Sequence, residues 1–404
     1  MNYQSFCYTN WYNSFYNYYL TCGAKLISLK IAVNTRLLLK NKLEGIGWFT
    51  YETLKRICTN HPEHEFIFLF DRPYDESFIF SENIKPIVLF PQARHPFLYY
   101  WFFEFSIPSV LKKEKVDLFL SPDGYLSLKT EIPQLAVIHD LNFEHFPNSL
   151  PKLTAYYYKK FFPKFSKKAT RIATVSNYSK KDLEATYSIS PTKIDVVFNG
   201  VNNKFIPITN SIKEKTKKKL SNGNPYFVFV GSLHPRKNII RLLKAYEQFR
   251  IKNSSTTYMV IVGEAMWNSI DIKNQVESMK YKNDVVFTGR LQQDDLVNTV
   301  GSALAMTFVP LFEGFGIPAL EAMQSGVPVI ASNTTSLPEV VGKAAVLVNP
   351  ESIEEISGAM NSISNLEEVR TKMISRGFVQ AEKYSWERTA QLLWESIEKV
   401  LPSK

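Results

Sequence analysis

The sequence EGFGIPALEAMQSGVPVIAS, residues 313–332, combines a glycine turn, a short helix and a strand. Pro318 suits the first position of a helix, where its missing N–H has no intrahelical partner to lose. Gly326 suits the helix exit, where a left-handed backbone conformation is favoured. Apolar runs at 303–312 and 327–332 are typical of buried parallel strands. The pattern therefore predicts strand, turn, helix and strand, which is the repeating unit of an α/β fold.

The helix of this unit is predicted to begin just beyond the strand ends, where open α/β sheets bind anionic ligands. The backbone N–H groups of Gly314, Phe315 and Gly316 can donate to ligand oxygens there. Glu313 and Glu321 bracket the turn, and their carboxylates can accept hydrogen bonds from hydroxyl groups. A ligand that carries both phosphate and a polyol fits this set of groups best. The stretch therefore predicts a nucleotide-sugar site.

The composition is that of an ordinary folded chain with a basic surplus. The 404 residues are 45% hydrophobic and 21% charged, enough for two or three domains with their own cores. The net charge of +10 favours anionic partners such as nucleotides, lipid head groups or nucleic acid. Cys7, Cys22 and Cys58 lack metal and disulfide spacing, so we expect a reducing compartment. The run PFLYYWFFEF at 96–105 is too short to span a membrane, and Glu104 interrupts it.

Strand and helix patterns fall into two blocks on either side of a lysine-rich stretch. Residues 210–224, NSIKEKTKKKLSNGN, contain few apolar residues and form the best domain boundary, with room for one helical turn or more. Residues 1–25 are rich in Tyr, Asn and Phe, and we expect a poorly ordered extension without a function. Predicted strands cover 29–38, 65–70, 85–90, 117–122, 134–141, 171–176, 193–202, 226–233, 256–264 and 284–291.

Two places in the first block carry candidate functional residues. Gly45 and Gly47 are predicted to form a turn before a helix, but the pattern GxGxxG is incomplete because Thr50 replaces its third glycine. The turn either only connects two elements or brings the backbone close to a phosphate or acceptor, and both interpretations stay open. His139 and Asp140 end an apolar strand, at the edge where α/β sheets bind ligands. This position favours a proton donor or ligand contact over a structural histidine beside a capping aspartate.

The second block begins with the strand YFVFVGSL, which reaches Gly231, and continues through HPRKN into a helix. Arg236 and Lys237 therefore lie at a strand-to-helix turn, where cations can bind a diphosphate together with the helix dipole. Adjacent cations are common on protein surfaces, but this placement favours a binding role.

These motifs resemble those of the retaining glycosyltransferases of family four, which have the GT-B architecture and include many bacterial polysaccharide mannosyltransferases. Glu313 and Glu321, with seven residues between them, match the family's glutamate pair. The segment YFVFVGSLHPRKNIIRLLKAY is similar to the start of the family's donor domain. VIHDLNFEHFP is similar to an acceptor-domain strand whose histidine, here His139, faces the reaction centre. VVFNGVN is similar to the strand before the interdomain link, although Asn202 stands where the family more often has Asp.

The resemblance covers residues 29–401 and implies two Rossmann-like parallel-sheet domains that face each other across a cleft. Residues 26–205 would bind the acceptor, 206–224 would link the domains, and 225–383 would bind the nucleotide sugar. Residues 384–404 would form a helix that crosses back to the first domain, which would explain the tryptophans in this last segment.

The resemblance also assigns roles within the predicted nucleotide-sugar site. Glu321 would bind the ribose hydroxyls of the donor. Glu313, with the N–H groups of Phe315 and Gly316, would bind and orient the transferred sugar rather than attack it.

The diphosphate leaving group would be neutralised by Lys237 with help from Arg236. These cations and the helix N-terminus would replace a metal, so we expect neither a metal nor another cofactor. Some relatives have an arginine where this chain has Ser232, so the diphosphate contacts would rest on the two cations alone.

By the same resemblance, the chain would transfer a hexosyl unit with retention of configuration, from a nucleotide diphosphate sugar to a saccharide or lipid-linked saccharide. This reaction would belong to surface polysaccharide synthesis. GDP-mannose is the first expectation for the donor, because VIHDLNF and GSLHPRKN look most like mannosyltransferases, and a UDP-hexose is the alternative. We expect a cytoplasmic enzyme in peripheral contact with the anionic inner face of the cell membrane.

Other function classes fit the sequence less well. A glycoside hydrolase also uses two carboxylates, but Glu313 and Glu321 lie on one turn-helix unit beside phosphate donors. A sugar-nucleotide epimerase on the same architecture would differ by turning over the donor without an acceptor. A non-catalytic basic protein at anionic membrane or nucleic acid is the alternative of another class. The lysines are spread along the chain without a nucleic-acid recognition motif, so we expect no nucleic-acid partner.

Overall fold

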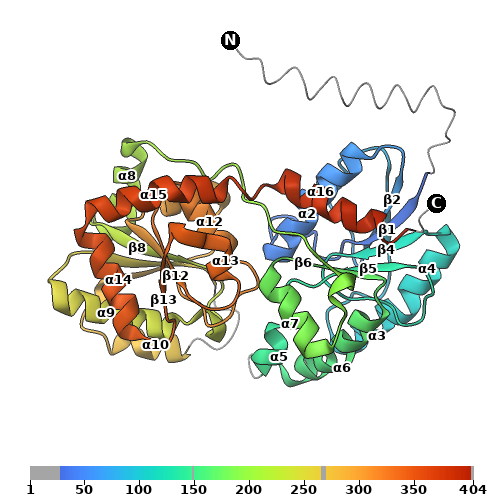
Figure 1. Ribbon diagram of the computed structural model, residues 1–404, viewed down its shortest axis with the longest axis horizontal. Coiled ribbons are helices and arrows are strands. Elements are labelled where there is room, and N and C mark those ends of the chain that lie inside the picture. The colour runs from blue at the N-terminus through green and yellow to red at the C-terminus, as the bar shows by residue number, and fades with distance from the viewer. Residues whose placement is uncertain (1–27, 148–149, 265–269, 402–404) are drawn as a thin grey trace, which may run out of the picture.

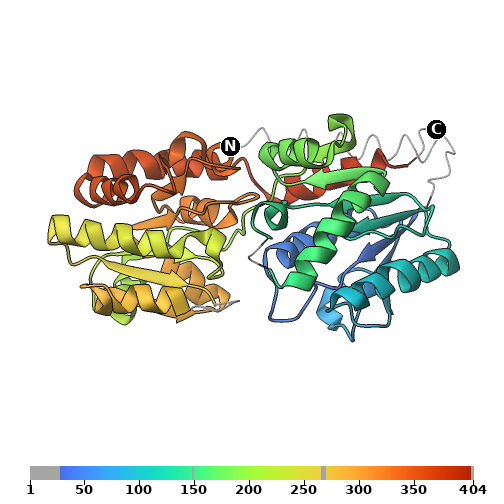
Figure 2. The same cartoon turned by 90° about the horizontal axis from the view of Figure 1, so that it is seen from below.

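The computed structural model describes residues 28–147, 150–264 and 270–401, so the predicted extension at 1–25 lies outside the described residues. The chain forms two α/β lobes, each built around one parallel sheet with helices packed against it (Figure 1). The lobes lie side by side along the long axis of the molecule (Figure 2). None of the described helices is long and apolar enough to cross a membrane.

The first lobe contains a seven-stranded parallel sheet with the order β3-β2-β1-β4-β5-β6-β7. Both faces are covered, because Ile31 and Val33 of β1 belong to one buried cluster and Ala32 belongs to another. The strand order reverses between β1 and β4, and open sheets bind ligands at such a point. The strands are β1 Lys30–Asn34, β2 Glu65–Phe70, β3 Ile84–Val88, β4 Leu118–Ser121, β5 Gln134–Val137, β6 Arg171–Thr174 and β7 Ile194–Val196.

Helices lie in most of the connections between these strands, and the strand order is that of a doubly wound sheet. A π-helical segment, Phe102–Ser106, joins α3 to α4 into one continuous rod. The helices are α2 Gly45–Asn60, α3 Pro96–Trp101, α4 Ile107–Glu114, α5 Asn142–His145, α6 Lys152–Lys168 and α7 Asn177–Tyr187.

The second lobe contains a six-stranded parallel sheet with the order β10-β9-β8-β11-β12-β13. Its strands are β8 Tyr226–Val230, β9 Tyr258–Val262, β10 Val285–Gly289, β11 Ala305–Phe308, β12 Val329–Ser332 and β13 Val346–Val348. Its helices are α8 Asn210–Ser221, α9 Ile239–Asn253, α10 Ile270–Glu277, α11 Gln293–Gly301, α12 Ile317–Gln324, α13 Leu337–Val341, α14 Ile353–Asn365 and α15 Glu367–Ala381.

The predicted glycine turn at Gly45 and Gly47 is wrong, because both residues lie inside α2, which begins at Gly45. The helix starts early because the Trp48 N–H already donates to the Glu44 carbonyl oxygen at 2.7 Å, which closes a helical turn over both glycines. Gly47 also packs closely against the preceding loop. An added Cβ at Gly47 would lie 3.0 Å from the carbonyl oxygen of Leu37. The lysine-rich stretch forms more than one helical turn, since α8 has 12 residues.

The last helix, α16 (Trp386–Glu398), crosses back to the first lobe, as predicted (Figure 1). Trp386 joins the apolar cluster that contains Phe49 of α2, and Arg56 of α2 forms an ion pair of 2.6 Å with Glu387. The two chain segments that connect the lobes run side by side at Gly200. An added Cβ there would lie 2.3 Å from the backbone nitrogen of Trp386, so only glycine fits this crossing.

Candidate active site

The turn after β11 has the geometry that the sequence predicts. Gly316 has a φ of +108° and precedes α12, and Pro318 lies in the first turn of that helix. A side chain at Gly316 would be strained by this φ, and an added Cβ, 2.5 Å from Leu337, would force that side chain to move. The turn and the start of α12 therefore follow the carboxyl end of a central strand, and their free N–H groups can meet an anion.

Glu313, the first residue of this turn, is held between two cations. Its carboxylate accepts a hydrogen bond of 3.0 Å from the Arg236 guanidinium and forms a second ion pair with the Lys237 ammonium. Burial alone would raise the pKa of Glu313, but the attraction of Lys237 and Arg236 outweighs it and lowers the pKa. The structure thus brings together the sequence-predicted cations and one of the two predicted glutamates, all largely buried.

Glu321, the second glutamate, lies inside α12 in different surroundings. No described residue donates a hydrogen bond to its carboxylate or forms an ion pair with it. Burial raises its pKa to about 8. The carboxyl group is therefore available to a ligand that brings its own donors.

Three neighbouring strands of the second lobe, β8, β9 and β10, reach glycines in the left-handed region. Gly231, Gly263 and Gly289 have φ values of +153°, +144° and +68°. An added Cβ at Gly263 would lie 1.9 Å from the carbonyl oxygen of Gly231, so two backbones touch there. The strand ends beside Arg236 and Lys237 therefore expose backbone rather than side chains to a ligand.

The two lobes touch where the turn of the second lobe meets the end of β5. An added Cβ at Gly314 would lie 2.7 Å from the carbonyl oxygen of His139 and 2.9 Å from Asp140. The Ser179 hydroxyl lies 3.1 Å from the His139 carbonyl oxygen and 3.4 Å from that of Gly314. Phe312 of the second lobe also packs within 5.0 Å of the His145 ring. Gly314 of the second lobe and the pair His139–Asp140 of the first, all singled out in the sequence, therefore meet at one interface.

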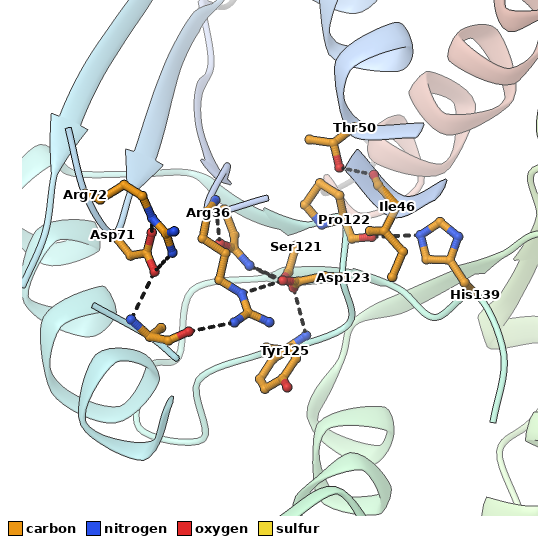
Figure 3. A network of polar contacts seen from close by, with 12 residues as sticks. Arg36, Ile46, Thr50, Asp71, Arg72, Ser121, Pro122, Asp123, Tyr125 and His139 are labelled. Carbon is orange, nitrogen blue, oxygen red and sulfur yellow. Dashed lines mark hydrogen bonds and ion pairs between the residues drawn. The ribbon is translucent and has the colours of Figure 1, made fainter. Parts of the chain in front are cut away.

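His139 has a defined tautomer at this interface (Figure 3). Its Nε2 lies 2.9 Å from the carbonyl oxygen of Pro122, so Nε2 carries the proton and donates it to that oxygen. Burial lowers the pKa of His139, which keeps the ring neutral near pH 7. Nδ1 is then a lone-pair acceptor, and the ring edge is fixed by Phe49, 4.9 Å away. Asp140 caps its own turn by accepting from Asn142 at 3.0 Å.

Comparison with known proteins identifies the chain. The profile described as Glycosyltransferase Family 4 matches residues 44–205, and that of Glycosyl transferases group 1 matches residues 210–380. The chain belongs to this glycosyltransferase family.

Similar proteins include enzymes of bacterial surface polysaccharide. The O-antigen chain mannosyltransferase B of Escherichia coli is 28% identical over 279 residues, which are 69% of this chain and 73% of that protein. The O-antigen chain mannosyltransferase RfbU of Salmonella typhimurium is 27% identical over 64% of this chain and 68% of its own. Among solved structures, Anabaena HepE in complex with UDP-glucose has a TM-score of 0.70 at 17% identity and covers 92% of this chain and 100% of its own. This last likeness shows the shared fold.

The glycosyltransferase has a polar network in its first lobe that the sequence analysis missed (Figure 3). Arg36, just after β1, forms a 2.6 Å ion pair with Asp123, just after β4. Asn34 donates to the same carboxylate at 2.8 Å, and the Arg36 guanidinium lies 4.3 Å from the Tyr125 ring centre. These residues flank the point where the strand order reverses. Polar residues after two adjacent central strands were the signal that could have found them.

One group of potential metal ligands exists among the residues that the structure of this glycosyltransferase describes. It consists of His61, Glu63 and His64, just past the end of α2. Helix rise places that end about 18 Å from Phe49, which contacts His139. The group therefore lies apart from the residues described above.

Proposed function

We propose that this glycosyltransferase moves a hexosyl unit, mannosyl in the first place, from a nucleotide diphosphate sugar to a saccharide or lipid-linked saccharide, with retention of anomeric configuration. The observation that carries the proposal is the pairing of Glu313 with Arg236 and Lys237 at the carboxyl edge of the second sheet. Two buried cations beside a helix N-terminus suit a diphosphate, and a carboxylate between them suits sugar hydroxyls.

Each group has a distinct role in this proposal. Lys237 and Arg236 neutralise the charge that develops on the leaving diphosphate, so the reaction needs no metal or other cofactor. Glu313 and the N–H groups of Phe315 and Gly316 orient the transferred sugar, and Glu321 accepts from the ribose hydroxyls. Gly231 lets the diphosphate approach the backbone at the end of β8.

The acceptor approaches from the first lobe in this proposal. His139, with its Nδ1 lone pair available, accepts a hydrogen bond from a hydroxyl at the reaction centre. Gly45 and Gly47 place the N-terminus of α2 beside the acceptor rather than forming a phosphate loop. The acceptor hydroxyl attacks the sugar on the face from which the diphosphate leaves.

Substitution at the cations and glutamates tests the proposal. Glu313→Ala, Glu321→Ala and Lys237→Ala should each lower turnover, the last by about 100- to 1000-fold. Glu354→Ala on the exposed start of α14 is the control and should leave turnover unchanged. Full activity in all three site variants would overturn the proposal. The anomeric configuration of the product, read by NMR, tests retention separately.

The donor proposal places GDP-mannose first and a UDP-hexose second. The two O-antigen relatives named above are mannosyltransferases, whereas HepE was solved with UDP-glucose. A thermal-shift panel of nucleotide sugars separates the two, because a ligand at 100 times its dissociation constant adds about 2.7 kcal/mol of stability. If neither donor shifts the unfolding temperature at any accessible concentration, the result would contradict a nucleotide-sugar site. We place the reaction at the cytoplasmic face of the cell membrane.

A further inference from the structure

The helix rod from α3 into α4 exposes several of its aromatic residues and buries Glu104. Phe97, Trp101 and Phe105 are 71%, 56% and 44% exposed, whereas Glu104 is only 4% exposed. The Glu104 carboxylate accepts from the backbone N–H of Leu128 at 3.0 and 3.2 Å. The Glu104 carboxylate is thus removed from a surface that stays aromatic.

This surface is continuous across neighbouring elements. The Trp101 and Phe105 rings lie 5.0 Å apart, and Tyr100 lies 5.9 Å from Phe161 of α6. Helix α6 adds the exposed side chain of Tyr156. We call this surface, formed by Phe90, Phe97, Leu98, Tyr100, Trp101, Phe105, Leu153 and Tyr156, the aromatic face. Exposed apolar residues gathered in this way on one lobe indicate a binding surface.

Lysines are interleaved with the aromatic face. The Lys129 ammonium lies 3.6 Å from the Phe105 ring centre, and that of Lys160 lies 5.4 Å from the Tyr156 ring centre. The Lys164 ammonium lies 5.7 Å from the Phe161 ring centre. Throughout the described ranges, no carboxylate forms an ion pair with any of these three lysines. Without a carboxylate in direct contact, their charges can attract an external anion.

We propose that the aromatic face docks on the surface of an anionic lipid bilayer. Trp and Tyr favour the water–lipid boundary, Phe and Leu favour the acyl region just below it, and unpaired lysines attract acidic head groups. The combination fits a lipid surface better than a protein partner, because an aromatic plane flanked by unpaired cations matches the layering of an anionic bilayer.

Docking through this face would also place the acceptor, a point that rests on the proposed function. The same helix that exposes Phe97 and Trp101 turns Tyr99 inward, where its ring centre lies 5.2 Å from the Arg36 guanidinium. Arg36 and Asp123 end the two central strands of the first lobe. A lipid-linked acceptor in the docked membrane would therefore lie one helix thickness from the strand ends.

Vesicle flotation of the full chain tests the docking. Wild-type protein should float with vesicles of phosphatidylglycerol and phosphatidylcholine, less with phosphatidylcholine alone, and less as salt rises. Phe97→Ser/Trp101→Ser should lower the partition coefficient at least tenfold. Lys160→Glu/Lys164→Glu should lower the partition coefficient more than tenfold. Loss of each lysine charge near anionic lipid lowers binding about fivefold, and the new negative charges lower it further.

Matched controls come from the second lobe. Ile251→Ser/Val379→Ser removes two side chains that are 58% and 61% exposed, and Lys215→Glu/Lys218→Glu reverses two exposed lysines of α8. Both controls should float like wild type. Each variant should keep its donor-induced thermal shift, so loss of docking and loss of the glycosyltransferase site are distinguishable.

Three outcomes would overturn the proposal. The first is wild-type protein that stays unbound with anionic vesicles, and the second is face variants that float as well as the controls. A wild-type dimer that Phe97→Ser/Trp101→Ser converts to a monomer, by sedimentation velocity, would show that a second copy covers the face instead.

Discussion

At the scale of single residues, the two glutamates of one turn-helix unit differ in their electrostatic state. Glu313 is ionised between Arg236 and Lys237, whereas burial raises the pKa of Glu321 to about 8 without any compensating cation. Both residues are equally acidic in the sequence pattern. Their pKa values differ because the fold brings cations within reach of Glu313 only. This suits Glu313 for a charged centre and Glu321 for hydroxyl groups that donate hydrogen bonds.

Donor binding is expected to release a proton from Glu321. Ribose hydroxyls that donate to its carboxylate favour the ionised form, so they lower a pKa that burial had raised to about 8. Below pH 8 the unliganded group is mostly protonated, and binding must remove that proton. Donor affinity should therefore rise with pH, by up to about tenfold per unit, and level off above pH 8.

Calorimetric titration of donor between pH 6 and 9 measures this linkage. Glu321→Gln should weaken donor binding and abolish the pH dependence, because glutamine cannot titrate. Glu354→Gln, at the exposed start of α14, should behave as wild type. A wild-type affinity that does not change with pH would show that Glu321 does not bind the donor as a carboxylate.

At the scale of elements, the strand ends of the second lobe depend on glycine because backbone meets backbone there. The β8 and β9 ends are linked by a 3.0 Å hydrogen bond from Gly231 N–H to the Val262 carbonyl oxygen. Gly263 follows, and its own N–H bonds the Gly289 carbonyl oxygen at 2.9 Å. The three strand ends thus form a bare backbone surface beside the two cations.

Gly263→Ala is expected to destabilise the protein by at least about 3 kcal/mol, since its φ is +144° and the new Cβ would overlap the Gly231 carbonyl. Gly358→Ala in α14 is the matched control, because nothing lies within 4 Å of its added Cβ. The control should gain about 0.5–1 kcal/mol from helix propensity. Thermal unfolding measures both, and an unchanged Tm for Gly263→Ala would contradict the close approach.

At the scale of the whole molecule, the contacts that join the lobes include two close approaches to backbone atoms. One is the crossing at Gly200 and Trp386, where both connecting segments meet. The other is the contact of Gly314 with His139, where the candidate active site closes. The second sets how closely the donor and acceptor sides approach.

Gly314→Ala should hold the lobes apart without unfolding either one. The added methyl would overlap the His139 carbonyl oxygen at 2.7 Å, and a shift of about 1 Å between reacting groups can lower turnover about 100-fold. Small-angle scattering should show a larger radius of gyration, with Tm within a few degrees of wild type.

Glu339→Ala is the control that removes a contact without adding bulk. It removes hydrogen bonds of 2.6 and 3.1 Å to Asn177 across the same interface. Equal effects of both variants would contradict a steric role for Gly314.

Local patterns in the sequence predicted much of the fold and of the donor side. The turn with Gly316 and Pro318, the strand before it, and the cations at the start of α9 all follow from residues close together in the chain. The same local reasoning placed Gly45 and Gly47 in a turn, because the sequence does not show that Gly47 packs against the Leu37 carbonyl. Contacts of that kind depend on how a loop folds back.

The sequence by itself determined the two α/β blocks and the residue types of the donor site, since hydrophobic periodicity and turn chemistry act over a few residues. The helix that crosses back was expected only from the family resemblance. Only the tertiary structure decided which groups meet. Arg36 and Asp123 pair across 87 positions, and Arg236 reaches Glu313 across 77. It also decided that Glu104 is buried while Trp101 is exposed. Ion pairing and burial depend on distances in space, which the order of residues along the chain does not fix.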